Sequence, residues 1–114
     1  MDFNQEEICV KYNAEFTLID ANLKVGVSKG ALARELPING LRHAIEGDTS
    51  GWYIWSGEEP SDDPEFFLPV HIFHLQGILP DVIKYLGLPP GWRFLIAPPD
   101  YEDVWQDTSL LNDY

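Results

Sequence analysis

Two stretches of the chain alternate apolar and other residues, which is the period-2 pattern of a strand with one buried face. In residues 21–27 (ANLKVGV), the side chains of Leu23, Val25 and Val27 fall on one face. Residues 41–45 (LRHAI) repeat the pattern after an Asn-Gly turn signal. Both stretches are therefore predicted to be strands that lie against a core.

Three further stretches have the composition of strands, and they are residues 52–55 (WYIW), 66–73 (FFLPVHIF) and 92–97 (WRFLIA). Their aromatic and β-branched residues suit the pleated, partly buried surface of a sheet. Pro69 cannot donate a backbone hydrogen bond, so its stretch is predicted to be an edge strand or to contain a bulge. Residues 104–105 are expected to add a short last strand.

Near the start of the chain, residues 8–10 (ICV) and 16–19 (FTLI) also have strand composition, with Asn13-Ala14 as a turn between them. Two helices are predicted. Ser28 stands in an N-cap position ahead of one, residues 29–36 (KGALAREL). Residues 79–87 (LPDVIKYLG) form the other, because a proline suits its first turn and a glycine its end.

Strands outnumber helices and do not alternate with them regularly, which predicts an α+β fold. The expected arrangement is a mostly antiparallel sheet with one or two short helices packed on it. At 114 residues, the chain has a usual single-domain length and can bury a sizeable core. We therefore expect a single domain over residues 1–114.

The net charge of the chain disfavours some classes of binding partner. Nineteen acidic and seven basic residues give a formal net charge of −12. Residues 58–114 hold eleven acids and two bases, whereas residues 1–57 hold eight acids and five bases. Because nucleic acids and anionic membranes are polyanions, this charge disfavours both as partners and favours a cationic protein.

The sequence also indicates a cytoplasmic location. The first residues (MDFNQEEICV) lack the basic and apolar regions of a secretory signal. The longest apolar stretch, residues 66–80, is interrupted by prolines and histidines and is too short to span a bilayer. The single cysteine, Cys9, cannot form an internal disulfide, which suits a reducing compartment.

No residue pattern predicts catalysis or a bound metal. His71 and His74 would face opposite ways in a strand, and neither Cys9 nor His43 completes a zinc site. Ser56 has no flanking signature of a nucleophile, and no glycine-rich phosphate-binding loop is present. We therefore expect a non-enzymatic protein with no catalytic residues, no metal site and no cofactor.

Two acidic segments are the candidate partner-binding sites. One is the loop of residues 58–65, and the other is the tail of residues 100–107, where acids surround Trp105. An aromatic side chain in an acidic surface is typical of a hot spot for a cationic partner; the alternative is that Trp105 folds inward and anchors the tail. The other aromatic residues of the predicted strands, such as Trp52, are expected to fill the core. The candidate partner-binding residues are Glu58, Glu59, Asp62, Asp63, Glu65, Asp100, Glu102, Asp103 and Trp105.

Several motifs occur in an order that resembles a known family. They are Ser28 after an apolar strand, Asp48-x-x-Gly51-Trp52 followed by Ser56-Gly57-Glu58, and later Pro80-Asp81, Leu86 and Gly91. Over about residues 25–105, the chain resembles a bacterial immunity-protein family found beside polymorphic toxins and formerly catalogued as a domain of unknown function. The resemblance implies an α+β domain that binds and neutralises a cognate toxin. It supplies no catalytic residues.

The main hypothesis is therefore a non-catalytic immunity protein that binds a cationic toxin through an acidic surface, with neither nucleic acid nor membrane as a partner. One alternative is an acidic protein-binding or regulatory module unrelated to toxins, of the SMI1/KNR4-like type. The other is a small hydrolase that uses some of the abundant carboxylates. The sequence predicts neither the identity of the toxin nor the oligomeric state.

Overall fold

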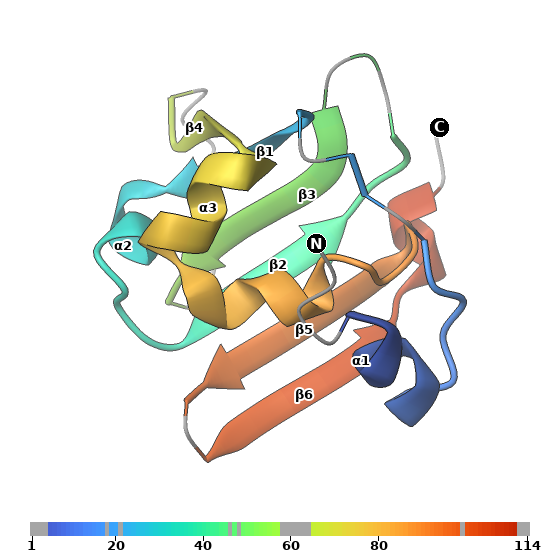
Figure 1. Ribbon diagram of the computed structural model, residues 1–114. Helices are drawn as coiled ribbons and strands as arrows, with labels where there is room; N and C mark the ends of the chain where they lie inside the picture. The colour runs from blue at the N-terminus through green and yellow to red at the C-terminus, as the bar shows by residue number, and fades with distance from the viewer. Residues whose placement is uncertain are drawn as a thin grey trace.

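A six-stranded sheet runs through the computed structural model, which describes residues 5–17, 19–20, 22–45, 47, 49–57, 65–98 and 100–111 (Figure 1). Its strands lie in the order β4-β1-β3-β2-β5-β6. The bounds are β1 (Lys24–Ser28), β2 (Ile38–Arg42), β3 (Thr49–Ser56), β4 (Phe67–His71), β5 (Trp92–Ala97) and β6 (Tyr101–Gln106). β1 and β3 pair in parallel, and the other neighbouring strands pair antiparallel. The predicted, mostly antiparallel sheet is confirmed.

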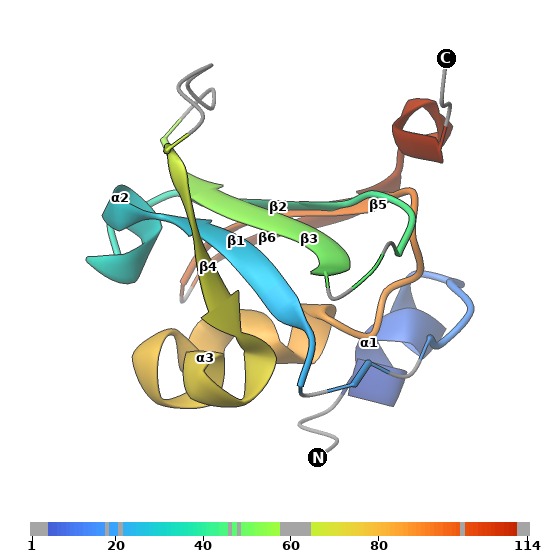
Figure 2. The same cartoon turned by 90° about the horizontal axis from the view of Figure 1, so that it is seen from above.

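Short helices accompany the sheet. In the described ranges they are α1 (Gln5–Lys11), α2 (Lys29–Leu32), α3 (Ile72–Ile78) and the 3-10 helices η1 (Pro80–Tyr85) and η2 (Thr108–Leu111). Figure 2 shows α1 and α3 on the same side of the sheet, and η1 packs against both. η2, the red segment near the C-terminus, lies on the other side. The predicted α+β fold is therefore confirmed. Within those ranges, no helix combines the length and the apolar character needed to cross a membrane.

Local sequence signals explain two of the helix starts. The Ser28 hydroxyl accepts a hydrogen bond from the backbone N–H of Ala31 at 3.1 Å, which makes Ser28 the predicted N-cap of α2. α2 ends at Leu32, earlier than predicted, and Arg34 then takes a left-handed φ of 62°. Pro80 occupies the first turn of η1, where its missing N–H leaves no bond unmade.

The core lies between the sheet and the layer formed by α1, α3 and η1. Trp52 and Ile54 of β3 are fully buried on this side. The indole N–H of Trp52 donates to the carbonyl of Leu86 at 3.1 Å and so ties the sheet to the segment after η1. The ring of Phe94 lies 5.6 Å from Trp52 and 4.8 Å from Tyr85. The prediction that Trp52 fills the core is confirmed.

The strand predicted over residues 8–10 is wrong, because these residues belong to α1. Ile8 and Cys9 are buried at 6% and 2% exposed, whereas Val10 is 80% exposed. A run of three apolar residues fits a helix as well as a strand, so its periodicity could not separate the two. Residues 16, 17 and 19, also expected to lie in a strand, have no regular structure.

Two other boundaries differ from the predictions. The strand expected over residues 66–73 is β4 only up to His71, and α3 begins at the next residue. Pro69 does lie on an edge strand, as predicted. The expected Asn-Gly turn lies inside β2, where a Cβ on Gly40 would come within 2.2 Å of the Phe94 ring. Gly40 therefore leaves room for a core aromatic side chain and does not form a turn.

Candidate functional site

The face of the sheet turned away from α1 and α3 carries a row of residues, one from each strand. Strand pairing places Pro69, Gly26, Tyr53, Leu41, Arg93 and Trp105 side by side, from β4 to β6. A second row holds Trp55, Asn39, Leu95 and Asp103, which pair across β3, β2, β5 and β6. We call these two rows, together with Phe67, the open face.

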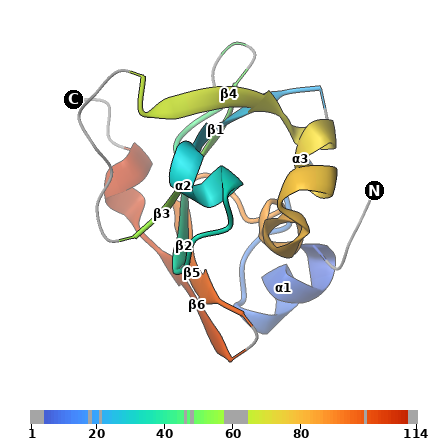
Figure 3. The same cartoon turned by 90° about the vertical axis from the view of Figure 1, so that its left-hand side faces the viewer.

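The described residues cover the open face much less than the opposite one. Figures 2 and 3 show α1 and α3 together on the far side of the sheet, with η2 on the open side near one corner. η2 is held there by a contact of 3.2 Å between His43 Nδ1 and the carbonyl of Leu110. Tyr53, Leu41 and Trp105 remain partly accessible to solvent, whereas Trp55 is buried.

A pocket of about 310 Å³ opens near one end of the open face, over β1. Its lining residues are Lys24, Gly26, Thr49, Tyr53, Phe67 and Pro69. The rings of Tyr53 and Phe67 meet edge to face, 5.1 Å apart. A Cβ on Gly26 would lie 2.8 Å from Tyr53 Cδ1 and 3.1 Å from Phe67 Cβ. The absence of a side chain at Gly26 thus allows the two rings to approach over β1.

At the other end, Trp105 lies against a charged pair. The guanidinium carbon of Arg93 is 5.4 Å from the centroid of the Trp105 ring, within reach of a cation–π interaction. Arg93 Nη1 also donates to Asp107 Oδ2 at 3.2 Å. Hydrogen bonds from Ser109 and Arg93 hold the pKa of Asp107 below its ordinary value. Of the two positions that the sequence left open for Trp105, the structure shows the outward one, with a partly buried ring.

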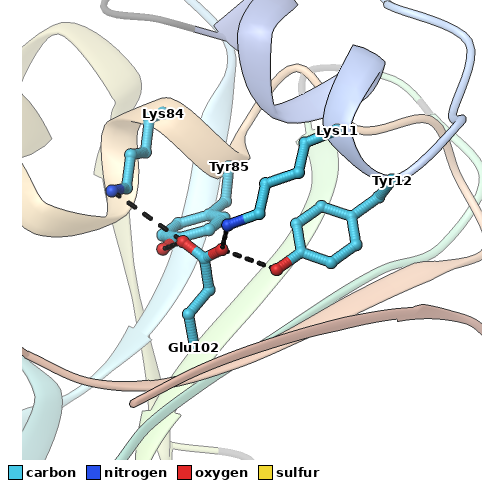
Figure 4. Close-up of polar contacts among 5 residues, drawn as sticks. All are labelled: Lys11, Tyr12, Lys84, Tyr85 and Glu102. Atoms are coloured by element: carbon cyan, nitrogen blue, oxygen red, sulfur yellow. Dashed lines mark hydrogen bonds and ion pairs between the residues drawn. The ribbon is translucent and has the colours of Figure 1, made fainter. Parts of the chain in front are cut away.

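Glu102 lies on the opposite face of β6 and is surrounded by donors (Figure 4). Its Oε2 accepts from Lys11 Nζ at 2.7 Å and from the Tyr12 hydroxyl at 2.5 Å. Its Oε1 accepts from the Tyr85 hydroxyl at 2.5 Å, and Lys84 Nζ is 3.9 Å away. Glu102 therefore links β6 to the end of α1 and to η1.

The contacts of Glu102 explain its titration. Partial burial disfavours the charged carboxylate, but the hydrogen bonds from Lys11, Tyr12 and Tyr85 outweigh this and lower the pKa of Glu102 to about 2. The same environment acts on Tyr85 in the other direction, since burial and the nearby carboxylate raise the pKa of its hydroxyl. Glu102 is thus ionised at neutral pH and committed to contacts inside the fold.

The structure separates the candidate residues taken from the sequence. Asp103 and Trp105 share the open face, while Glu102 points to the covered side. Glu65 and Asp100 are exposed, before β4 and before β6 respectively. The remaining candidates, Glu58, Glu59, Asp62 and Asp63, lie outside the described residues.

Sequence reasoning missed the middle of the open face, namely Gly26, Tyr53, Leu41 and Arg93. The alternation within β1 and β3 was a usable signal, because a residue between two core positions must point to the other face. Which strands lie side by side was not readable from that alternation. The row across the whole sheet depends on the long-range order of the strands.

Most of the positive charge is engaged inside the fold. Lys11, Lys84 and Arg93 form the ion pairs described above. Arg42 is fully buried, and its guanidinium donates to two backbone carbonyls at 2.9 and 2.8 Å. Burial lowers the pKa of Arg42 to about 10, so this side chain is still charged at neutral pH. Arg34 Nε also donates to the backbone carbonyl of Ile78 at 3.0 Å. At least five of the seven basic residues are therefore bound to groups of the protein itself.

The positions of His71, His74 and Cys9 bear on metal binding and on thiol chemistry. The rings of His71 and His74 come within 6.0 Å of each other, because the chain passes from β4 into α3 between them. Across the described part of the chain, no group of three or more His, Cys, Asp or Glu residues could hold a metal ion. Cys9 is buried, and burial raises the pKa of its thiol, which disfavours the reactive thiolate.

Comparison with known proteins gives one match. The sequence model of the Imm33-like domain family matches residues 4–107, a range that contains all six strands. No curated protein and no solved structure matches the chain. The sequence resemblance began near residue 25, whereas the family match also includes α1 and its contact with Glu102.

Proposed function

Because the chain belongs to the Imm33-like domain family, we propose that it is a non-catalytic immunity protein that binds and neutralises a cognate toxin in the cytoplasm. The family match indicates an immunity-type protein and therefore a protein partner. The α+β fold is the one that the sequence resemblance implied. The identity of the toxin is outside this proposal.

The charge distribution is the observation that supports a toxin with a cationic surface as the partner. The net charge is −12, and at least five of the seven bases are engaged within the fold. Exposed acids such as Glu65, Asp100 and Asp103 therefore set the sign of the surface. A toxin that acts on a polyanionic substrate presents a cationic surface. An acidic protein is attracted to such a surface and associates with it rapidly.

The test combines capture with neutralisation. The tagged chain is used to capture partners from a lysate of its own host, with washes at low and then at high salt. The expected result is a stoichiometric basic protein that is retained at low salt and lost as salt rises.

The captured protein is then expressed in a bacterial host, with and without the chain. Growth arrest that the chain relieves supports the immunity function. A captured partner that is not toxic, or whose toxicity the chain leaves unchanged, would contradict it and favour an acidic binding module outside toxin systems.

A further inference from the structure

We propose that the open face is the docking surface for the toxin, and that the occupant is a toxin domain with a basic surface. In the complex, an apolar side chain of the toxin enters the pocket over Gly26, and basic groups of the toxin lie against Asp103 and Trp105. This inference rests on the proposed function, because it names the surface that the immunity protein uses.

The composition of the open face is the first argument. Phe67, Tyr53, Leu41, Leu95 and Trp105 present aromatic and aliphatic side chains on neighbouring strands. All five are partly accessible to solvent. A contiguous apolar patch on a soluble protein marks an interaction site. Tyrosine and tryptophan are also enriched in binding hot spots, because they bury a large area with few rotatable bonds.

The pocket over Gly26 gives the patch a shape that a partner can fill. It is bordered by the rings of Tyr53 and Phe67 and holds about 310 Å³, which is enough for one large side chain. Glycine at this position is not required by a left-handed backbone, since Gly26 is not among the glycines with positive φ. Its structural effect is to let the rings of Tyr53 and Phe67 approach each other over β1, where they border the pocket.

Charge argues for a basic partner and against a second copy of the chain. Arg93, the basic member of the row that crosses the sheet, is already paired with Asp107, so Asp103 is left to set the charge beside Trp105. Two copies meeting through this face would each carry a net charge of −12 and would repel each other. A toxin domain with basic residues around an apolar contact complements both features.

The experiment measures binding of the purified toxin, in an inactivated form, to the chain and to three matched pairs of variants. Trp105→Ala is paired with Phe73→Ala, because Phe73 is an exposed aromatic residue of α3, on the far side of the sheet. We expect Trp105→Ala to weaken binding by roughly 30-fold or more and Phe73→Ala by less than about threefold.

Asp103→Lys is paired with Glu7→Lys, which lies on α1. Each reversal adds two positive charges, so both take the net charge from −12 to −10 and differ only in position. At low salt, we expect Asp103→Lys to slow association by about three- to tenfold and Glu7→Lys by less than about twofold.

Gly26→Ala is paired with Gly77→Ala, because a Cβ on Gly77 would meet nothing within 4 Å. We expect Gly26→Ala to weaken binding by about tenfold, whereas Gly77→Ala leaves it unchanged. Thermal unfolding of each variant verifies that it is folded. If Gly26→Ala does not fold, toxin binding by Trp105→Ala and Asp103→Lys tests the docking surface.

Four outcomes are distinguishable. Loss of binding in the open-face variants with retention in their controls supports the inference. If the unmodified chain binds the toxin and the open-face variants bind as tightly as their controls, the docking surface lies elsewhere and the inference is wrong, although the proposed function stands. If the unmodified chain sediments as a dimer that Trp105→Ala dissociates, the occupant is a second copy, which also overturns it. A chain that binds no toxin at all contradicts the proposed function itself.

Discussion

Gly51 shows how one residue of β3 is fixed by its surroundings. Its φ of 89° belongs to the left-handed region, and a Cβ at this position would lie 2.1 Å from the carbonyl oxygen of His43. The backbone carbonyl of Gly51 accepts from the N–H of His43 at 2.8 Å, so the two strands approach closely here. The sequence shows Gly51 only as part of the Asp48-x-x-Gly51-Trp52 motif, and the positive φ is the first requirement for glycine at this position. The second requirement, space for the neighbouring strand, depends on strand pairing.

A pair of substitutions separates these two requirements. Gly51→Ala should lower the free energy of unfolding by about 2–4 kcal/mol, because backbone strain and the contact with His43 act together. Gly57→Ala, at a φ of 86° with nothing within 4 Å of a new Cβ, should cost only about 1–2 kcal/mol for strain. Urea unfolding of both variants measures the difference. Equal losses would show that the contact with His43 carries no energy.

At the scale of elements, the Glu102 cluster joins three segments that are far apart in the sequence. α1 contributes Lys11 and is followed at once by Tyr12, and η1 contributes Lys84 and Tyr85 (Figure 4). The sequence predicted a short strand near residues 104–105, and β6 confirms and extends it. The sequence did not predict which face of the sheet each carboxylate of β6 occupies. Residues 8–10 of α1 were expected to form a strand, so no helix end was expected to contact Glu102. Because α1 was predicted wrongly, the contacts of Glu102 were not predicted.

Replacing Glu102 tests the contribution of this cluster. Glu102→Gln should lower the free energy of unfolding by about 1–3 kcal/mol near neutral pH, since charged hydrogen bonds become neutral ones and the exposed lysines are screened by solvent. Asp103→Asn, on the opposite face of the same strand, is the matched control and should change stability by less than about 0.5 kcal/mol. Denaturant unfolding provides the measurement. A loss of the same size in both variants would mean that the cluster adds nothing specific.

The pH dependence gives the same cluster a second test. In the folded chain the pKa of Glu102 is about 2, below its ordinary value of 4.5. As pH falls, the unfolded state therefore binds this proton first, and the stabilisation present above pH 4.5 is lost between about 4.5 and 2. The difference in unfolding free energy between the unmodified chain and Glu102→Gln should shrink from pH 6 toward pH 2. A difference independent of pH would show that the carboxylate charge is not its source.

At the scale of the whole molecule, the net charge and the fold class could be predicted from the sequence, whereas the order of the strands in the sheet could not. The α+β class and the largely antiparallel sheet followed from the alternating stretches, and the net charge of −12 followed from composition. The strand order β4-β1-β3-β2-β5-β6 could not be predicted, because β1 pairs in parallel with β3 and not with β2, the next strand in the sequence. The row from Pro69 to Trp105 is a consequence of that order. For this reason, the two acidic segments could be identified from the sequence while the open face could not.

Net charge predicts how the isolated chain responds to salt. At a net charge of −12, the folded chain repels itself more strongly than the expanded chain does, and added salt screens this repulsion. The Tm should rise by about 2–5 °C when NaCl is raised from about 10 to 300 mM. Differential scanning calorimetry across that range provides the measurement. A falling Tm would mean that internal ion pairs such as Lys11 with Glu102 outweigh the surface repulsion.

The alternation of side chains along the strands has an evolutionary consequence. In β6, Val104 packs on the core and Glu102 is tied to α1, whereas Asp103 and Trp105 point the other way. Substitutions at Asp103 alter the charge offered to the proposed partner while the contacts of Val104 and Glu102 stay in place. Substitutions at Trp105 alter the shape of this surface and also its contact with Arg93. Under the proposed function, recognition of the toxin can therefore diverge at these positions while the architecture is inherited unchanged.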